Sequence, residues 1–292
     1  MRDIIIGILL AAGASACFNL ATVVQAGETR EVETRGTASL ALLGQLVKRK
    51  RWLAGVGVQL VAVPLQLAAL TLAPLAVVQP ADATGLVVLL IAGQRMLGEK
   101  VGWREAVSVA AIFLGVIGVA LSGPEHSPNN AGTLSLILVL GPLTLLALTP
   151  YLLRRKIPSG VMVVAAGTAF ALTAFLMKIL ADSLLASEWA SLILWGTAAG
   201  LIAVLGLNSE QGALQVRTVA RVAPIIFVIE LALPIVLGPI IGGEHWPKDT
   251  AMAALLLGAL LLTIAGAVSL MRSGAVNAVL EAEQEAEQAQ AS

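Results

Sequence analysis

Apolar runs long enough to cross a membrane recur along this chain, and they constrain its fold more than any other feature. A helix of about 20 apolar residues crosses the hydrocarbon core of a bilayer. Lipid cannot hydrogen-bond the backbone, so only helices and closed barrels span it. The runs here are continuous rather than alternating, which indicates helices. We mark nine spans, at residues 4–25, 52–72, 74–95, 106–122, 132–153, 159–182, 189–208, 217–241 and 249–271.

The composition agrees with an integral membrane protein and argues against a metalloenzyme. The chain is 58% apolar and 12% charged, whereas soluble domains carry roughly 25% charged residues. The single cysteine, Cys17, excludes a disulfide framework, and two histidines leave little with which to build a zinc or iron site. No phosphate-binding loop and no HExxH motif occur. We therefore expect no enzyme activity and no cofactor, and the sequence leaves any metal unknown.

The N-terminal segment MRDIIIGILLAAGASAC resembles a signal peptide, because it has a basic start, an apolar core and an A-x-A-like end. The apolar run continues through FNLATVVQ, however, and this extension gives it the length of a spanning helix. We therefore expect the segment to remain in the protein as its first helix.

A charged linker, residues 26–51, separates the first two spans. Its second half, residues 37–47, is mostly apolar but short, and the basic cluster KRKR (48–51) follows it. Such a segment is typical of an interfacial helix anchored by its basic residues. A strongly tilted tenth spanning helix is the alternative.

The distribution of Lys and Arg predicts the orientation. With nine spans, fifteen of these residues fall on one face, and two, Arg2 and Lys248, fall on the other, while Lys178 lies inside a span. Cytoplasmic loops carry the excess of Lys and Arg. We therefore expect a plasma (inner) membrane protein with its N-terminus outside and its C-terminus inside. Residues 272–292 would then form an acidic cytoplasmic tail.

The second half of the chain repeats the sequence pattern of the first half. QLAALTLAPLAVVQP (66–80) aligns without gaps on EQGALQVRTVARVAP (210–224), so that Gln66 meets Glu210 and Pro80 meets Pro224. The alignment predicts a first repeat (1–122), a connecting fifth helix (123–158) and a second repeat (159–271). One intervening span forces the two copies to cross the membrane in opposite directions. Inverted repeats of this kind are the basis of alternating access in transporters.

The segment from 68 to 121, with its apolar helix, its Gly98-Glu99 turn and its final small-residue helix, resembles the drug/metabolite transporter superfamily, including EamA-type exporters. The second copy has the same turn at Gly243-Glu244. The nine-span layout and the basic linker look closer to the NIPA magnesium-transporter branch, and Lys178 matches a lysine near the end of helix 6 in that branch. The resemblance covers residues 4–271. It implies membrane transport without fixing the substrate, since the superfamily moves amino acids, sugars, nucleotides, drugs and cations.

Two acids lie inside predicted spans, where ionisable groups are costly and usually functional. Asp82 falls about 12 Å into the third span at 1.5 Å per residue, and Glu230 falls near the middle of the eighth. Pro80 and Pro224 precede them, and a proline frees a backbone carbonyl upstream. We expect both acids to line one central cavity that binds a coupling proton or a cationic substrate, with helix breaks at the two prolines. The other candidate site residues are Gln79, Thr84, Asn19, Gln66 and Lys178.

For several of these residues the sequence leaves alternatives open. Lys178 could reach the interface instead of a cavity. Asn19 and Gln66, with Gln25 and Gln59, could either line a cavity or hold helices together. Further along the chain, we expect a solvated cytoplasmic turn, with a gate as the alternative, where four polar residues cluster: Asn208, Glu210, Arg217 and Arg221.

The function predicted from the sequence is secondary transport of a small metabolite or cation by alternating access, with a proton as candidate coupling ion. The alternatives are a non-transporting subunit of a larger membrane complex and a flippase or membrane enzyme acting on lipid-linked substrates. The expected partners are the substrate and the lipid bilayer, with no nucleic acid. A homodimer or an association with other membrane proteins is left open.

Overall fold

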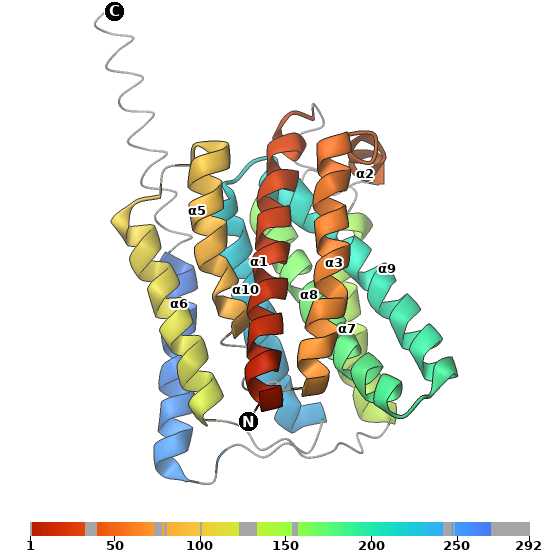
Figure 1. The fold of residues 1–292 in the computed structure, drawn as a ribbon, viewed down its shortest axis with the longest axis vertical. Helices are drawn as coiled ribbons and strands as arrows, with labels where there is room; N and C mark the ends of the chain where they lie inside the picture. Colours follow the sequence, from red (N-terminus) through yellow and green to blue (C-terminus); the bar gives the residue numbers. More distant parts are fainter. Residues whose placement is uncertain are drawn as a thin grey trace, which may run out of the picture.

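The computed structural model describes residues 2–32, 40–72, 78, 81–99, 101–122, 133–153, 157–241, 247 and 249–269. All regular secondary structure within these ranges is helical (Figure 1). The helices are α1 (Arg2–Arg30), α2 (Leu40–Leu46), α3 (Lys50–Leu72), α5 (Gly85–Leu97), α6 (Trp103–Ser122), α7 (Thr133–Leu152), α8 (Ser159–Leu185), α9 (Trp189–Leu214), α10 (Val219–Ile241) and a last helix (Thr250–Ser269). The predicted all-α fold is confirmed.

Five segments of the described chain are long and apolar enough to cross a membrane: Ile5–Arg30, Lys50–Leu72, Ser159–Met177, Trp189–Leu214 and Thr250–Ser269. Helices α6, α7 and α10, with 20, 20 and 23 residues, also reach about 30 Å or more at 1.5 Å per residue. Large apolar side chains lie on the outer surface, among them Leu9, Leu60, Ile193 and Leu261. An apolar exterior of this extent is expected of a protein surrounded by lipid. The chain is a multi-pass membrane protein.

The short helix α2 does not cross the membrane. Its seven residues extend only about 10 Å, which excludes the tilted tenth span for the described part of the linker. Leu42 and Leu46 are fully buried and pack with Trp52 at the start of α3. Arg49 binds Glu28 at 3.1 Å and Glu31 at 2.6 Å, so the linker folds back onto the end of α1.

The same packing pattern occurs in both halves of the chain. In the first half α1 packs along α3 and α5, and in the second half α8 packs along α9 and α10 (Figure 1). Helix α6 packs against the last helix. Their glycines allow this contact, because a Cβ atom at Gly115 would clash with Thr263, and one at Gly266 would lie 2.9 Å from Ile112 Cγ1.

Most of the predicted basic face lies at one end of the molecule, which we call the basic end. It is the upper end in Figure 1, where α1 and α5 finish and α3 and α6 begin. Helices α8 and α10 also begin there, because Arg217 contacts both Ser159 and Arg30. Helix α1 therefore runs toward the basic end, and α8 runs away from it.

The described part of the third span has a one-residue interruption at Thr84, which we call the helix break, although Thr84 keeps helical dihedral angles (φ −61°, ψ −27°). Residues 81–83 are helical, Thr84 forms a turn, and α5 starts at Gly85. The expected break at Pro80 lies outside the described residues. The expected break at Pro224 is absent, since α10 is helical from Val219 to Ile241. Pro224 lies in the second turn of α10, where it removes the hydrogen bond to the Ala220 carbonyl without ending the helix.

Candidate functional site

Asp82 lies at the helix break and is paired with an amide from α3. Gln66 Nε2 donates a hydrogen bond of 2.9 Å to Asp82 Oδ2. The other oxygen of each group, Asp82 Oδ1 and Gln66 Oε1, is buried and accepts no hydrogen bond from the described residues. The two candidate residues predicted from the sequence are therefore in direct contact, and together they present two buried acceptor atoms without a donor.

The polar face of α1 holds the break in place. The Ser15 hydroxyl donates to the Asp82 carbonyl oxygen, and Asn19 Nδ2 donates to Ser15 O at 2.9 Å. Gly85 allows this approach, because a Cβ atom there would clash with the Ser15 hydroxyl and the Asn19 amide. Thr84 bonds locally, with its hydroxyl 2.6 Å from Ala81 O. Asn19 and Thr84 thus support the site through backbone contacts rather than by touching the Asp82 carboxyl.

Two further acids join Asp82 within the bundle. Glu230 of α10 interacts electrostatically with both Asp82 and Glu210. Glu210 lies on α9 and is buried, with the Thr22 side chain of α1 as a hydrogen-bond partner. Glu230 is therefore close enough to interact with the charges of both Asp82 and Glu210.

The position of Glu210 corrects the expectation from the sequence. Asn208 and Glu210 were expected in a solvated turn, but α9 continues to Leu214 and both residues are buried. The polar residues Ser209, Glu210 and Gln211 lie on α9, which packs against α8 and α1. A run of polar residues at the end of an apolar span predicts a loop, because hydropathy does not show that neighbouring helices bury these residues.

Next to Glu210, an amide chain connects three helices. Gln211 Nε2 donates to Gln25 Oε1 at 2.9 Å, and Gln25 Nε2 donates to Gln59 Oε1 at 3.0 Å. The Thr29 hydroxyl donates to Gln211 Oε1 at 2.5 Å. These groups satisfy one another between α1, α3 and α9, so Gln25 and Gln59 do hold helices together.

A polar stripe follows one side of α1 from the Asp82 site to the basic end: Ser15, Asn19, Thr22, Gln25, Thr29 and Arg30. The steps of three and four residues place most of these side chains on one helical face. The stripe extends about 22 Å at 1.5 Å per residue. Each member bonds to a group on another helix or to a neighbour in the stripe.

The stripe ends in a cluster that joins both halves of the chain, and we call it the latch: Arg30, Glu99, Arg217 and the first residues of α10. The Glu99 side chain is 3% exposed and forms a salt bridge with Arg30. Its carboxylate also accepts hydrogen bonds from the backbone N–H groups of Val219 at 2.8 Å and Ala220 at 3.1 Å. It therefore caps the N-terminus of α10, where the helix dipole favours a negative charge.

Local geometry aims Glu99 at α10. Helix α5 ends at Leu97 and is followed by Gly98, whose φ of 65° is left-handed, a conformation that glycine adopts without a steric penalty. Arg30 also reaches Arg217 O at 3.4 Å, and Arg217 Nε donates to Ser159 Oγ at 2.6 Å. The latch thereby connects α1 and α5 with α8 and α10.

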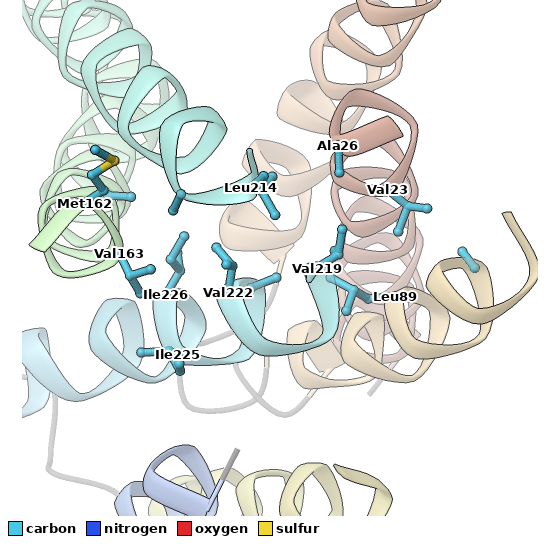
Figure 2. Packing of buried hydrophobic residues seen from close by; sticks show 14 of the residues in the cluster. Val23, Ala26, Leu89, Met162, Val163, Leu214, Val219, Val222, Ile225 and Ile226 are labelled. Carbon is cyan, nitrogen blue, oxygen red and sulfur yellow. The ribbon is translucent and has the colours of Figure 1, made fainter. Parts of the chain in front are cut away.

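Apolar side chains pack directly beside the latch. Val219, which donates to Glu99, also belongs to a buried cluster contributed by α1, α5, α8, α9 and α10. Figure 2 shows Val23, Leu89, Leu214 and Val222 turned toward this shared region. The latch therefore lies beside an apolar layer at the basic end.

Some predicted site residues cannot be placed. Gln79 and Pro80 lie outside the described residues, as does the side chain of Lys178 within α8. Glu99, Glu210, Gln211, Ser15 and Thr22 were not predicted as site residues. The polar periodicity of α1 was a signal for two of them, since polar residues repeating at helical spacing within an apolar span indicate a face turned away from lipid.

Comparison with known proteins gives two distant relatives. The chain is 27% identical over 130 residues to the probable magnesium transporter NIPA9 of Arabidopsis thaliana, a match covering 42% of this chain and 38% of the plant protein. It is 25% identical over 289 residues to an uncharacterized protein of Corynebacterium glutamicum, covering 95% of this chain and 99% of that protein. No family model matches the chain, and no solved structure matches it. The chain thus spans less than half of the plant relative's length.

Proposed function

We propose that this protein is a secondary transporter that carries a small cation or a cationic metabolite across the membrane. The observation that carries the proposal is the electrostatic connection of Asp82, Glu210 and Glu230 inside a bundle of apolar helices. Carboxylates are expensive in a bilayer and mark substrate or ion pathways. The side chains bonded to Asp82 and Glu210 are an amide and a hydroxyl, so no described partner neutralises them.

The distant match to a probable magnesium transporter supports transport in general and makes Mg²⁺ one substrate to test. A transported cation would supply the positive charge that the three acids lack. A proton could take the same place as a coupling ion, because a carboxyl can bind it and release it. The proposal therefore covers a cationic substrate, a coupling proton, or both in alternation at one site.

Alternating access would follow from an inverted repeat. Helix α1 packs along α3 and α5 as α8 packs along α9 and α10, and α6 packs against the last helix. Members of each matched pair run in opposite directions relative to the basic end, as α1 and α8 do. The helix break beside Asp82 is also typical of transporters, whose sites are formed by discontinuous helices near the bilayer midplane.

In this mechanism the latch is the gate at the basic end. Because Lys and Arg favour the cytoplasmic side, that end would face the cytoplasm, and the described conformation would be closed to it. Opening requires Arg30 and Glu99 to separate from α10, which would release the apolar layer beside Val219. Substrate binding at the acids would favour one of the two conformations by its differential affinity.

Uptake into proteoliposomes tests the proposal. Purified protein is reconstituted and assayed with a panel of Mg²⁺, monovalent cations, amines and amino acids, with and without a proton gradient. We expect saturable transport of at least one cation, and its loss in Asp82→Asn and Glu210→Gln. Thr197→Val is the matched control, since this exposed hydroxyl bonds only its own helix at Ile193 O. Transport of none of these substrates would overturn the proposal and favour the non-transporting subunit.

A further inference from the structure

With the Asp82 carboxyl ionised, the hydrogen-bonding groups around it are unbalanced toward acceptors. Gln66 Nε2 is bonded to Asp82 Oδ2, the Ser15 hydroxyl to the Asp82 carbonyl oxygen, and Asn19 Nδ2 to Ser15 O. Each of these nearby donor atoms therefore already makes at least one hydrogen bond. Asp82 Oδ1 and Gln66 Oε1 are buried and have no partner in the part of the chain described. Buried acceptors without a donor are costly, so their retention calls for an explanation.

The ionisable groups near these acceptors are acidic, so the site also favours a positive charge. Asp82 contributes a carboxyl group, and Glu230 adds a second one within electrostatic range. The preferred ligand must therefore donate at least two hydrogen bonds and carry a positive charge. An ammonium group meets both conditions, since –NH₃⁺ has three donors and no acceptor.

We propose that the Asp82–Gln66 pair binds the primary ammonium group of the transported substrate, an inference that rests on the proposed transport function. One N–H would reach Asp82 Oδ1 and another Gln66 Oε1. The hydrogen bond from Gln66 Nε2 fixes both acceptors in place, which makes Gln66 a specificity-determining residue. The ligand completes the hydrogen bonding that the protein alone leaves open.

Other cations fit the same two atoms less well. Mg²⁺ requires near-ideal octahedral oxygen coordination at about 2.0–2.1 Å and sheds water reluctantly. No group of three or more His, Cys, Asp or Glu side chains able to hold a metal ion occurs in the described residues. A quaternary ammonium ion has the charge but lacks N–H donors, so it would leave both acceptors unpaired.

The neighbouring apolar residues indicate an alkyl substituent on the ammonium group. Ala81 precedes Asp82, Ala69 lies one turn after Gln66, and Ala11 lies one turn before Ser15. All three belong to one buried cluster with Val78. The pair is therefore next to small aliphatic side chains, which suit an alkyl group rather than a polar one.

Competition binding in detergent tests this inference without relying on a vesicle assay, which uncharged amines would leak through. Radiolabelled ethylammonium is the probe, and unlabelled ethylammonium, tetramethylammonium and Mg²⁺ are the competitors. Loss of a hydrogen bond to a charged group weakens binding by about tenfold or more. We therefore expect tetramethylammonium and Mg²⁺ to compete at least about tenfold less well than ethylammonium.

The variants Gln66→Leu and Gln59→Leu provide a matched comparison. Both replace an amide on α3, but Gln59 bonds Gln25 rather than Asp82. We expect Gln66→Leu to weaken ethylammonium binding about tenfold and Gln59→Leu to leave it unchanged. The comparison of competitors on the unaltered protein remains decisive if Gln66→Leu does not fold.

Three results would overturn the inference. Equal competition by tetramethylammonium would show that charge alone is recognised, and stronger competition by Mg²⁺ would show a metal site. Absence of ethylammonium binding by a protein that transports another cation would refute ammonium recognition while leaving the transport function intact. Absence of any transport in the proteoliposome panel, by contrast, would refute the proposed function itself.

Discussion

The carboxylate of Glu99 accepts a hydrogen bond from the backbone N–H of Val219, 120 residues further along the chain, at 2.8 Å. The same carboxylate pairs with Arg30 and caps α10 through Ala220. One buried side chain therefore connects the ends of α1 and α5 with the start of α10.

Exchanging the charged residues Arg30 and Glu99 of the latch should not preserve the stability of the protein. In the double variant Arg30→Glu, Glu99→Arg an ordinary ion pair would re-form, but an arginine cannot accept the hydrogen bonds that Val219 and Ala220 donate to Glu99. Breaking a buried ion pair costs about 3–5 kcal/mol. We expect Glu99→Arg and the double variant both to lower the melting temperature in detergent, by similar amounts.

The exposed ion pair of Arg49 is the control for that measurement. It binds Glu28 and Glu31 near the surface, where such pairs contribute about 0–1 kcal/mol. Arg49→Ala should therefore change the melting temperature little. Full recovery of stability in the charge-exchanged latch would contradict the dual role of Glu99.

Much of the helical layout could be predicted from hydropathy alone. The predicted span 132–153 corresponds to α7 (Thr133–Leu152), and 249–271 corresponds to the last helix (Thr250–Ser269). Apolar length determines these helices because lipid permits no other backbone structure here. The sequence indicated Asp82 and Gln66 as candidate site residues on neighbouring spans, but it did not predict the contact between them.

The rest depends on tertiary contacts that hydropathy does not contain. Glu210 appeared to be a loop residue because its burial comes from α1 and α8, which lie far away in sequence. Glu99 could be predicted only as part of a turn. Its partners, Val219 and Ala220, are apolar residues that donate through their backbone N–H groups, so their side chains do not reveal the contact. Backbone donors at a helix N-terminus have no side-chain signature.

Gly85→Ala should disrupt the helix break. The added Cβ atom would lie 2.8 Å from Ser15 O and would clash with the Ser15 hydroxyl and the Asn19 amide. Because backbone is among the atoms met, α1 and α5 would have to separate. We expect transport and ligand binding to fall more than tenfold, and a tenfold loss of affinity corresponds to about 1.4 kcal/mol. The melting temperature should also drop.

Gly57→Ala is the matched control for Gly85→Ala. Gly57 also lies within a helix, α3, and nothing lies within 4 Å of the position of its Cβ atom. Alanine should be neutral or stabilising there, by up to about 1 kcal/mol. If both glycine variants behaved alike in binding and stability, the close approach of α1 to the break would have no functional weight.

Gln211→Leu should uncouple the three helices of the amide chain. It would leave Gln25 Oε1 without its donor and would remove one of the two oxygens within hydrogen-bond distance of the Thr29 hydroxyl. Hydrogen bonds between membrane helices average about 0.6 kcal/mol and reach about 1.7 kcal/mol. We therefore expect a modest fall in melting temperature. A double-mutant cycle with Gln25→Leu measures the coupling, and additive effects would contradict the hydrogen-bonded chain.

Opening of the basic end should expose residues that the latch now covers. Leu214 is fully buried and packs beside Val219, so a cysteine there reports on the apolar layer. In a Cys17→Ser, Leu214→Cys background, a soluble maleimide should react slowly while the latch is intact. Adding Glu99→Ala should speed the reaction, because the free energy that favours the closed state falls when α10 loses its cap and Arg30 its partner. Adding Arg49→Ala should leave the rate unchanged. Equal labelling rates with and without Glu99→Ala would mean that the apolar layer, rather than the latch, keeps this end closed.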